Sequence, residues 1–141
     1  MHKDNDFKTQ YGYMLSERDS TGLSASMEDY VEMIYRLSAE VIRVNTLAMH
    51  LHVTPSAVSR MAKQLKRHGL VEFERYGYIT LSDEGKKTGA FLLWRHETVT
   101  DLLTLINKDC PKLSEIEQIE HYLSPSTVRD IEDFLNRYAI Q

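Results

Sequence analysis

The stretch VNTLAMHLHVTPSAVSRMAKQL, residues 44–65, decides the fold of this chain. Apolar side chains recur twice in it with the spacing i, i+3, i+4, i+7, which predicts two short amphipathic helices; they are Val44, Leu47, Ala48 and Leu51, then Val58, Met61, Ala62 and Leu65. A three-residue turn, His52-Val53-Thr54, separates them, and Pro55 stands in the first turn of the second helix, where proline is tolerated. The pattern is typical of a helix-turn-helix, with the small Ala48 at the helix crossing and an expected core of Leu51, Val53, Val58 and Met61. The alternative is a helical hairpin with no role in nucleic-acid binding.

The residues on either side of this stretch complete a winged helix. Upstream, apolar spacing predicts a helix over residues 27–39, and residues 1–25 form an arm without sustained periodicity. Downstream, two short strands are predicted around the turn Arg75-Tyr76-Gly77, over residues 70–74 and 78–81. A β-hairpin directly after a helix-turn-helix is a wing, and Arg75 at its tip can contact a phosphate or a minor groove. The alternative for Arg75 is a solvated turn residue.

The C-terminal part of the chain predicts three more helices. Ser82 is the expected N-cap of a long helix that ends near Asn107, and two acids in its first turn favour the helix dipole. Two shorter helices follow, over residues 114–123 and after Ser124-Pro125. Because so short a segment cannot bury all their apolar faces, the pattern favours a homodimer. We expect a mainly α protein with an N-terminal arm (1–25), a winged helix-turn-helix domain (26–88) and an all-helical dimerisation domain (89–141).

Composition and charge narrow the class of protein. The 141 residues are 42% hydrophobic and 27% charged, which is ordinary for a globular protein. No apolar run is long enough to span a membrane, and a single cysteine, Cys110, excludes an intramolecular disulfide and favours the cytoplasm. The net charge is −4, yet residues 41–88 carry +4 and the remainder −8. A basic segment inside an acidic chain indicates a polyanionic partner, and the alternative is a solvated basic surface; the helix-turn-helix within this segment favours double-stranded DNA as the partner.

The second helix of the helix-turn-helix is the expected DNA-reading element. Its helical phase places one set of side chains outward, and Arg75 joins them from the wing; the predicted DNA contacts are Thr54, Ser56, Ala57, Ser59, Arg60, Lys63, Gln64, Arg67 and Arg75. Arg60 and Gln64 are the expected base readers. Phosphate contacts are expected from Lys63, Lys66 and Arg67.

Acids and histidines recur at helical spacing outside this segment. Glu117, Glu120 and His121 project from one helical face, Asp29 and Glu32 have the same i, i+3 relation upstream, and His96 lies on the long helix. Each has an alternative reading: Asp29 as a capping-box partner of Ser26, the acids as a solvated face, and the histidine as a structural residue. Together they are rich in oxygen, contain two imidazoles and lack sulfur, which suits Mn²⁺ or Fe²⁺.

Five segments carry a resemblance to a known family; they are Ser26–Glu32, Val53–Val58, Leu81–Lys87, Arg95–Glu97 and Glu117–Leu123. From about Ser26 to Tyr138 the chain resembles the manganese transport regulators, the compact branch of the diphtheria toxin repressor superfamily of metal-activated bacterial repressors. The arm is longer than is usual there, and the SH3-like domain of the larger relatives is expected to be absent.

The resemblance implies a two-metal site whose ligands are Asp29, Glu32, His96, Glu117, Glu120 and His121. The iron-responsive relatives have Met in place of Asp29 and Cys in place of Glu117, so this chain replaces soft sulfur with hard oxygen, which favours manganese. We expect two Mn²⁺ per subunit, with Fe²⁺, Cd²⁺ or Zn²⁺ as substitutes.

The predicted function is that of a cytoplasmic, Mn²⁺-activated homodimeric repressor of metal-uptake genes, which binds a palindromic operator. No membrane and no small-molecule substrate are expected, and the protein is not expected to be an enzyme. Two alternatives stay open: a metal-independent winged-helix regulator, and a small di-metal hydrolase, since carboxylate–histidine sets also activate water.

Overall fold

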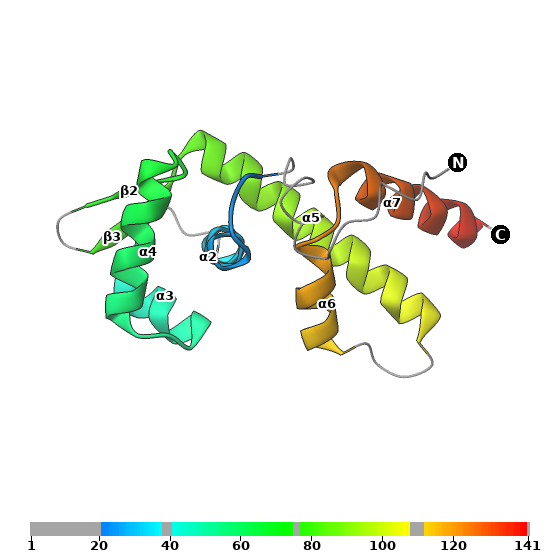
Figure 1. The fold of residues 1–141 in the computed structure, drawn as a ribbon, viewed down its shortest axis with the longest axis horizontal. Coiled ribbons are helices and arrows are strands. Elements are labelled where there is room, and N and C mark those ends of the chain that lie inside the picture. The colour runs from blue at the N-terminus through cyan, green and yellow to red at the C-terminus, as the bar shows by residue number, and fades with distance from the viewer. Residues whose placement is uncertain (1–20, 38–40, 75–76, 108–111, 141) are drawn as a thin grey trace, which may run out of the picture. The chain divides into compact units, whose positions relative to one another are not determined.

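A computed structural model describes residues 21–37, 41–74, 77–107 and 112–140, and the described chain is mainly helical (Figure 1). Most of the predicted N-terminal arm, Arg75 at the wing tip and Cys110 lie outside the described residues. The chain forms two compact units, Leu23–Arg95 and the part from His96 onward. The predicted domain limits, 26–88 and 89–141, stay a prediction.

The first unit begins with helix α2, Ala25–Arg36. Ser24 is its N-cap, because the Ser24 hydroxyl oxygen accepts a hydrogen bond from the Met27 amide at 3.2 Å. The alternative in which Ser26 forms a capping box with Asp29 is therefore wrong, since Asp29 lies in the second turn of the helix. Its apolar face buries Val31 and Ile34 almost completely.

The helix-turn-helix is present as predicted, with α3 at Val44–Leu51 and α4 at Pro55–Arg67. Thr54 caps α4 by accepting from the Ala57 amide at 3.1 Å. His52 ends α3 in the left-handed region with φ 58°. One predicted core residue is wrong: the side chain of Val53 is 37% exposed, because the turn directs it outward, and Leu47, Ala62 and Leu65 are buried in addition to Ala48 and Val58.

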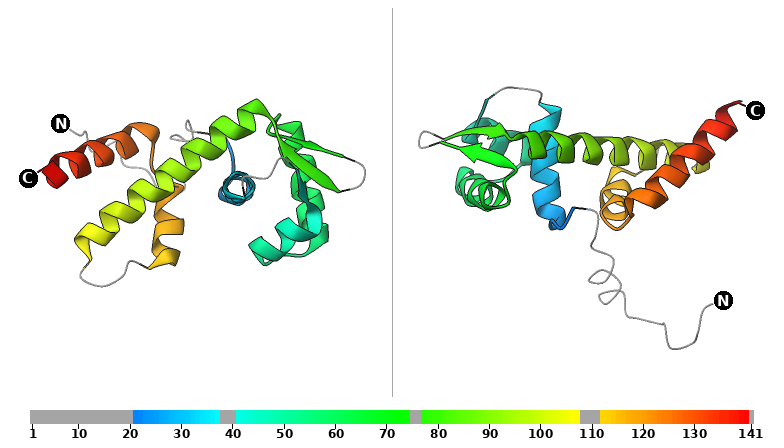
Figure 2. Two further views of the ribbon diagram at one scale, coloured as in Figure 1. Left: turned by 180° about the vertical axis from the view of Figure 1, so that it is seen from behind. Right: turned by 90° about the horizontal axis from the view of Figure 1, so that it is seen from above.

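A small antiparallel sheet is formed by one strand before the helix-turn-helix and two strands after it (Figure 2). Its strands are β1 (Ile42–Arg43), β2 (Val71–Phe73) and β3 (Tyr78–Leu81), in the order β1-β3-β2. The β2–β3 pair confirms the predicted wing, with Phe73 opposite Ile79. Strand β1 was not predicted, because two residues carry no detectable periodicity and only pairing with β3 defines them.

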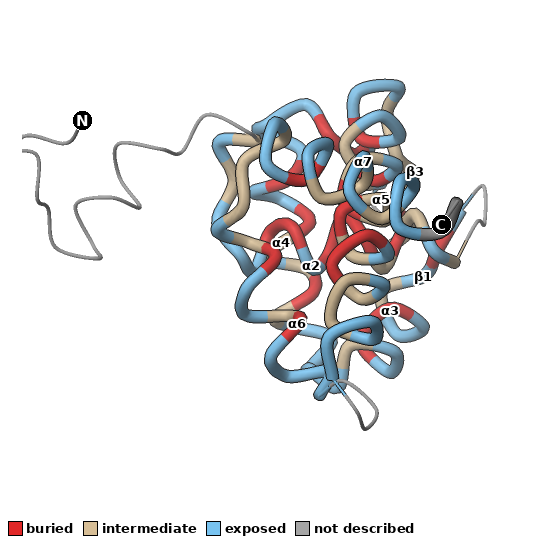
Figure 3. Tube along the Cα trace, turned by 90° about the vertical axis from the view of Figure 1, so that its right-hand side faces the viewer, coloured by how far each residue is buried: buried red, intermediate tan, exposed pale blue. Residues whose placement is uncertain are grey.

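Helix α5, Asp83–Ile106, begins in the first unit, and its N-cap is the predicted Ser82. The Ser82 hydroxyl accepts from the Gly85 amide at 3.0 Å and donates to the Gly69 carbonyl at 2.6 Å. Buried apolar residues of α2, α3, α4, the sheet and the start of α5 form one core, and the alternation of buried and exposed positions can be followed in Figure 3. This core fixes the helix-turn-helix and the wing as one body.

The second unit contains the rest of α5, then α6 (Leu113–Glu120) and α7 (Pro125–Ile140). Val99, Ile116 and Val128 are its most buried apolar residues. Several large apolar side chains stay exposed in the single chain, namely Leu105, Ile106, Leu113, Ile119, Tyr122, Phe134 and Tyr138. Such an exposed set is typical of a protein–protein interface. Among the described residues, no helix has the length and apolar content needed to cross a membrane.

Candidate metal centre and DNA-binding surface

Two of the predicted ligands, Asp29 and Glu32, lie one helical turn apart on α2 in the first unit. Glu32 is buried, and its carboxylate contacts Arg36 of the same helix. The Arg36 Nε donates to Glu32 Oε2 at 2.8 Å, and Arg36 Nη2 lies 2.7 Å from the same oxygen. The carboxylate of Glu32 is therefore held by a guanidinium.

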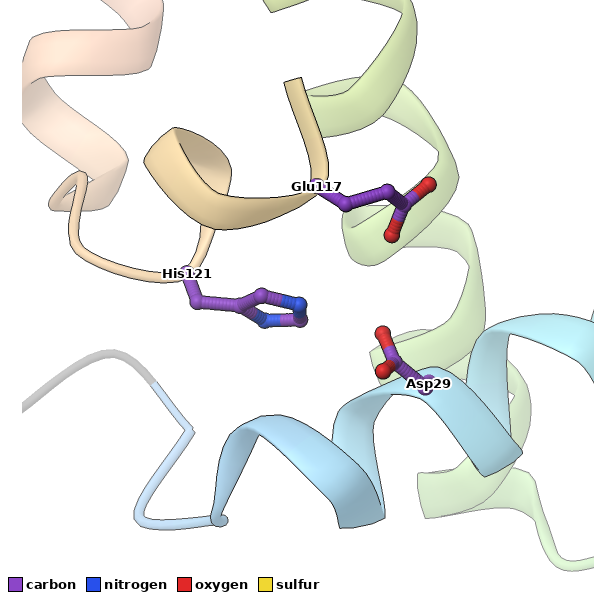
Figure 4. Close-up of side chains that lie close together, drawn as sticks. All are labelled: Asp29, Glu117 and His121. Atoms are coloured by element: carbon purple, nitrogen blue, oxygen red, sulfur yellow. The ribbon is translucent and has the colours of Figure 1, made fainter. Parts of the chain in front are cut away.

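The second unit brings His96 together with two carboxylates of α6. His96 Nδ1 lies 2.7 Å from Glu120 Oε2 and 3.5 Å from Glu117 Oε1. His121 is the C-cap of α6, and Figure 4 shows Glu117 and His121 extending from the same side of this helix. The side chains of His96, Glu117 and Glu120 thus lie close together within the unit. The fourth predicted ligand of this unit, His121, lies one helical turn after Glu117 at the end of α6.

The carboxylate of Glu120 is the most constrained acidic group of this unit. Its side chain is fully buried, and Oε1 has no hydrogen-bond donor among the described residues. A buried carboxylate oxygen without a donor costs folding free energy unless a cation or a donor satisfies it. The residues present therefore fit a divalent cation: they offer carboxylate oxygens and imidazole nitrogens, and one buried oxygen still lacks a partner within the described chain.

Sequence reasoning missed a buried ion pair next to two of the predicted ligands. Glu28 immediately precedes Asp29, and Arg95 immediately precedes His96. Arg95 Nη1 lies 3.2 Å from Glu28 Oε2, and Nη2 donates to the other oxygen at 3.4 Å, with both side chains almost completely buried. The Phe91 ring lies 5.7 Å from the guanidinium. The available signal was a single basic residue in the apolar stretch 90–95.

The outward face of α4 agrees with the predicted DNA-binding surface in most positions. Exposed side chains are those of Thr54, Ser56, Arg60, Lys63, Gln64, Lys66 and Arg67, whereas Ala57 and Ser59 are half-buried. Arg60 also lies close enough to Tyr30 of the core to influence its pKa. Burial raises the pKa of the Tyr30 hydroxyl, and the positive charge of Arg60 offsets part of this rise. Direct DNA contacts stay a prediction for all of these residues.

Arg43 is a basic residue of this unit that the sequence analysis did not select. It is exposed on β1, and its Nη2 donates to the Tyr78 hydroxyl at 3.1 Å. Its guanidinium also lies 5.4 Å from the Tyr78 ring centroid. A cation is therefore held in a fixed orientation at the base of the wing.

The fold and the donor chemistry together define a winged-helix DNA-binding protein with a candidate metal centre in its helical half. The family described as "Iron dependent repressor, N-terminal DNA binding domain" matches residues 22–79, and "Iron dependent repressor, metal binding and dimerisation domain" matches residues 82–140. The chain belongs to the iron-dependent repressor family. Its class is that of metal-dependent DNA-binding transcriptional repressors, which dimerise and are not enzymes.

Relatives of known name agree with this assignment. The chain is 37% identical over 116 residues to the HTH-type transcriptional regulator MntR of Bacillus subtilis, covering 80% of this chain and 82% of that protein. It is 36% identical to MntR of Oceanobacillus iheyensis, covering 80% and 79%.

Solved structures give the same fold. The manganese regulator SloR superposes with a TM-score of 0.64 at 28% identity, and ScaR with bound Zn²⁺ with a TM-score of 0.65 at 26% identity. Each match covers 78% of this chain and 53% of the other, so the chain spans about half the length of these structures.

Proposed function

We propose that this chain is a Mn²⁺-activated homodimeric repressor of metal-uptake genes that acts in the cytoplasm on a palindromic operator. The observation that carries the proposal is the buried Glu120 carboxylate, which contacts His96 through one oxygen and has no donor to the other within the described chain. Burial of such a group costs folding free energy unless a cation or a donor satisfies it. The similar structure described as the manganese regulator SloR supports the choice of metal.

The proposed ligands are Asp29, Glu32, His96, Glu117, Glu120 and His121, which offer four carboxylates and two imidazoles. This donor set suits divalent ions of hard to borderline character. We propose two Mn²⁺ per subunit, with Fe²⁺, Cd²⁺ or Zn²⁺ as substitutes. Four carboxylates would balance the charge of two such ions.

The position of the ligands in the chain explains how metal would control DNA binding. Asp29 and Glu32 belong to the unit that contains the helix-turn-helix, whereas the other four ligands belong to the unit from His96 onward. A bound cation would supply the positive charge that the carboxylates of both units need to share one site without repulsion. Asp29 and Glu32 of α2 would then hold the winged helix to the dimerisation helices.

A fixed orientation is what a dimeric DNA reader needs. Its two recognition helices must match half-sites about 34 Å apart, one turn of B-DNA, or a multiple of that spacing. Metal would act through a differential affinity for the competent arrangement. Moving the population from 1:99 to 99:1 requires about 5.5 kcal/mol of such a difference.

The wing and α4 would supply the DNA contacts. Arg60 and Gln64 are the proposed base readers, and Lys63, Lys66 and Arg67 the proposed phosphate contacts. Thr54, Ser56, Ala57 and Ser59 would line the same surface, with Arg75 at the wing tip. The half-buried positions of Ala57 and Ser59 suit close approach of the backbone to DNA, because neither side chain protrudes.

The test is DNA binding with and without metal. Duplexes are selected from a random pool with the full chain in Mn²⁺, and their affinity is then measured by fluorescence anisotropy in Mn²⁺ and in chelator at one ionic strength. Fixed ionic strength matters because phosphate contacts depend on salt. We expect tight binding in Mn²⁺ only. Equal affinity in both conditions would contradict activation and favour the metal-independent regulator, as would purified protein that takes up no Mn²⁺.

A further inference from the structure

The guanidinium of Arg36 engages one oxygen of a proposed metal ligand. Both Nε and Nη2 of Arg36 contact Oε2 of Glu32, at 2.8 and 2.7 Å. We infer that Arg36 competes with the metal ion for the Glu32 carboxylate and thereby raises the Mn²⁺ concentration at which the protein becomes loaded. The inference rests on the proposed function, because it takes Glu32 as a metal ligand.

The contact is a strong one for two residues of the same helix. The side chain of Glu32 is 10% exposed, so its carboxylate has lost most of its water, and two charge-assisted hydrogen bonds replace that water. The spacing i, i+4 with the acid on the N-terminal side is the favourable order for a pair on a helix. Both effects stabilise the metal-free form of α2.

The same contact opposes metal binding. An arginine side chain keeps its charge at all accessible pH values, so it cannot leave the carboxylate by losing a proton. A guanidinium and a divalent cation on one carboxylate repel each other, so a cation on either oxygen weakens or displaces the contact with Arg36. Metal binding at Glu32 would therefore compete with the guanidinium.

The exposure of Arg36 makes this exchange reversible. Its side chain is 36% exposed, so the guanidinium has direct access to solvent. A displaced guanidinium is hydrated by solvent, so the free-energy cost of displacement is mainly the loss of its contact with Glu32. Arg36 is thus placed to adjust affinity without contacting DNA and without being a ligand.

A purely structural role for the pair makes a different prediction. If Arg36 only stabilised α2, its removal would lower the free energy of unfolding of the metal-free protein and leave the Mn²⁺ affinity of the folded protein unchanged. If Arg36 competes with metal, its removal tightens Mn²⁺ binding.

The experiment is a titration of metal-free full-length protein with Mn²⁺ in the absence of DNA, with free Mn²⁺ quantified by electron paramagnetic resonance. Arg36→Met keeps the aliphatic stem and removes the charge, and Arg36→Gln serves as a second neutral variant. The matched control is Lys87→Met, which removes the same charge from the exposed Glu84–Lys87 pair of α5, where neither residue is a proposed ligand. Thermal unfolding in chelator checks that each variant is folded.

We expect both Arg36 variants to bind Mn²⁺ about 3- to 10-fold more tightly than wild type, the size expected for loss of one charge-assisted contact. The control should change the affinity by less than about 2-fold, since exposed pairs contribute little. If wild type binds Mn²⁺ and the folded Arg36 variants bind it with unchanged or weaker affinity, this inference is wrong and the proposed function still stands. A wild type that binds no Mn²⁺ would overturn the proposed function as well.

Discussion

The substitution Glu120→Gln separates a metal-ligand role of this residue from a structural one. Glutamine keeps the shape of the side chain and removes its charge. In the metal-free protein the change loses a charge-assisted hydrogen bond with His96, which is 2.7 Å long and worth about 1.5–3 kcal/mol. It also replaces a buried charged oxygen that has no donor among the described residues by a neutral amide group, which lowers the cost of burial by about 1–3 kcal/mol. The two effects offset each other, so the free energy of unfolding in chelator should change by about 1 kcal/mol or less.

The effect with metal should be much larger. A ligand at 100 times its Kd stabilises the folded state by about 2.7 kcal/mol. A loss of affinity of about 100-fold would leave roughly 0.4 kcal/mol of this stabilisation, because the ligand would then be near its Kd. The difference of about 2.3 kcal/mol corresponds to a fall in Tm of roughly 5–10 °C for a chain of this size.

The assay is thermal unfolding followed by circular dichroism, in chelator and in Mn²⁺, for wild type, Glu120→Gln and the control Glu115→Gln. Glu115 is an exposed acid on the same helix, so its loss should not affect the metal-induced shift in Tm. An equal metal-induced shift in wild type and Glu120→Gln would refute the ligand assignment. A loss of more than about 3 kcal/mol in chelator would show that the carboxylate is structural instead.

Three further predictions concern the winged-helix unit. Arg95→Met should lower the free energy of unfolding by about 3–5 kcal/mol, because Glu28 would stay buried without its cation, and adding Glu28→Gln should restore most of this loss. Urea unfolding measures the free energy of unfolding of both variants. A loss of less than about 1 kcal/mol in Arg95→Met would contradict the importance of the pair. Because burial raises the pKa of Tyr30 above its usual value near 10, the stability from this residue is complete below that value and is lost as the pH rises through the folded pKa. The free energy of unfolding of Tyr30→Phe should therefore fall less steeply than that of wild type as the pH rises from neutral to strongly alkaline. Identical dependence of this free energy on pH in the two proteins would show that Tyr30 does not contribute to it. Lys63→Ala should weaken DNA binding equally on all sequences and reduce the salt slope by about 1, whereas Arg60→Ala should relax base specificity; anisotropy titrations at several salt concentrations distinguish the two.

The sequence determined the local elements of this protein because short-range patterns specify them. The repeated apolar spacing of residues 44–65 predicted both helices of the helix-turn-helix, and Ser82 marked the start of α5 through a hydroxyl that accepts from its own backbone. The chemical type of the metal donors was also readable, since oxygen and imidazole groups at helical spacing need no tertiary information to be noticed. Their assignment as ligands of one two-metal site was implied by the family resemblance.

The tertiary structure decided which groups meet across long stretches of chain. The pair Glu28–Arg95 joins residues 67 positions apart, and the two residues of β1 become a strand only by pairing with β3. The contact of His96 with Glu120 likewise spans 24 positions. Helical and strand periodicities describe neighbours within a turn or two, so they carry no information on such contacts. Burial of charge depends on the complete packing around it, and for that reason Glu28, Arg95 and Glu120 could be recognised as buried only in the folded chain.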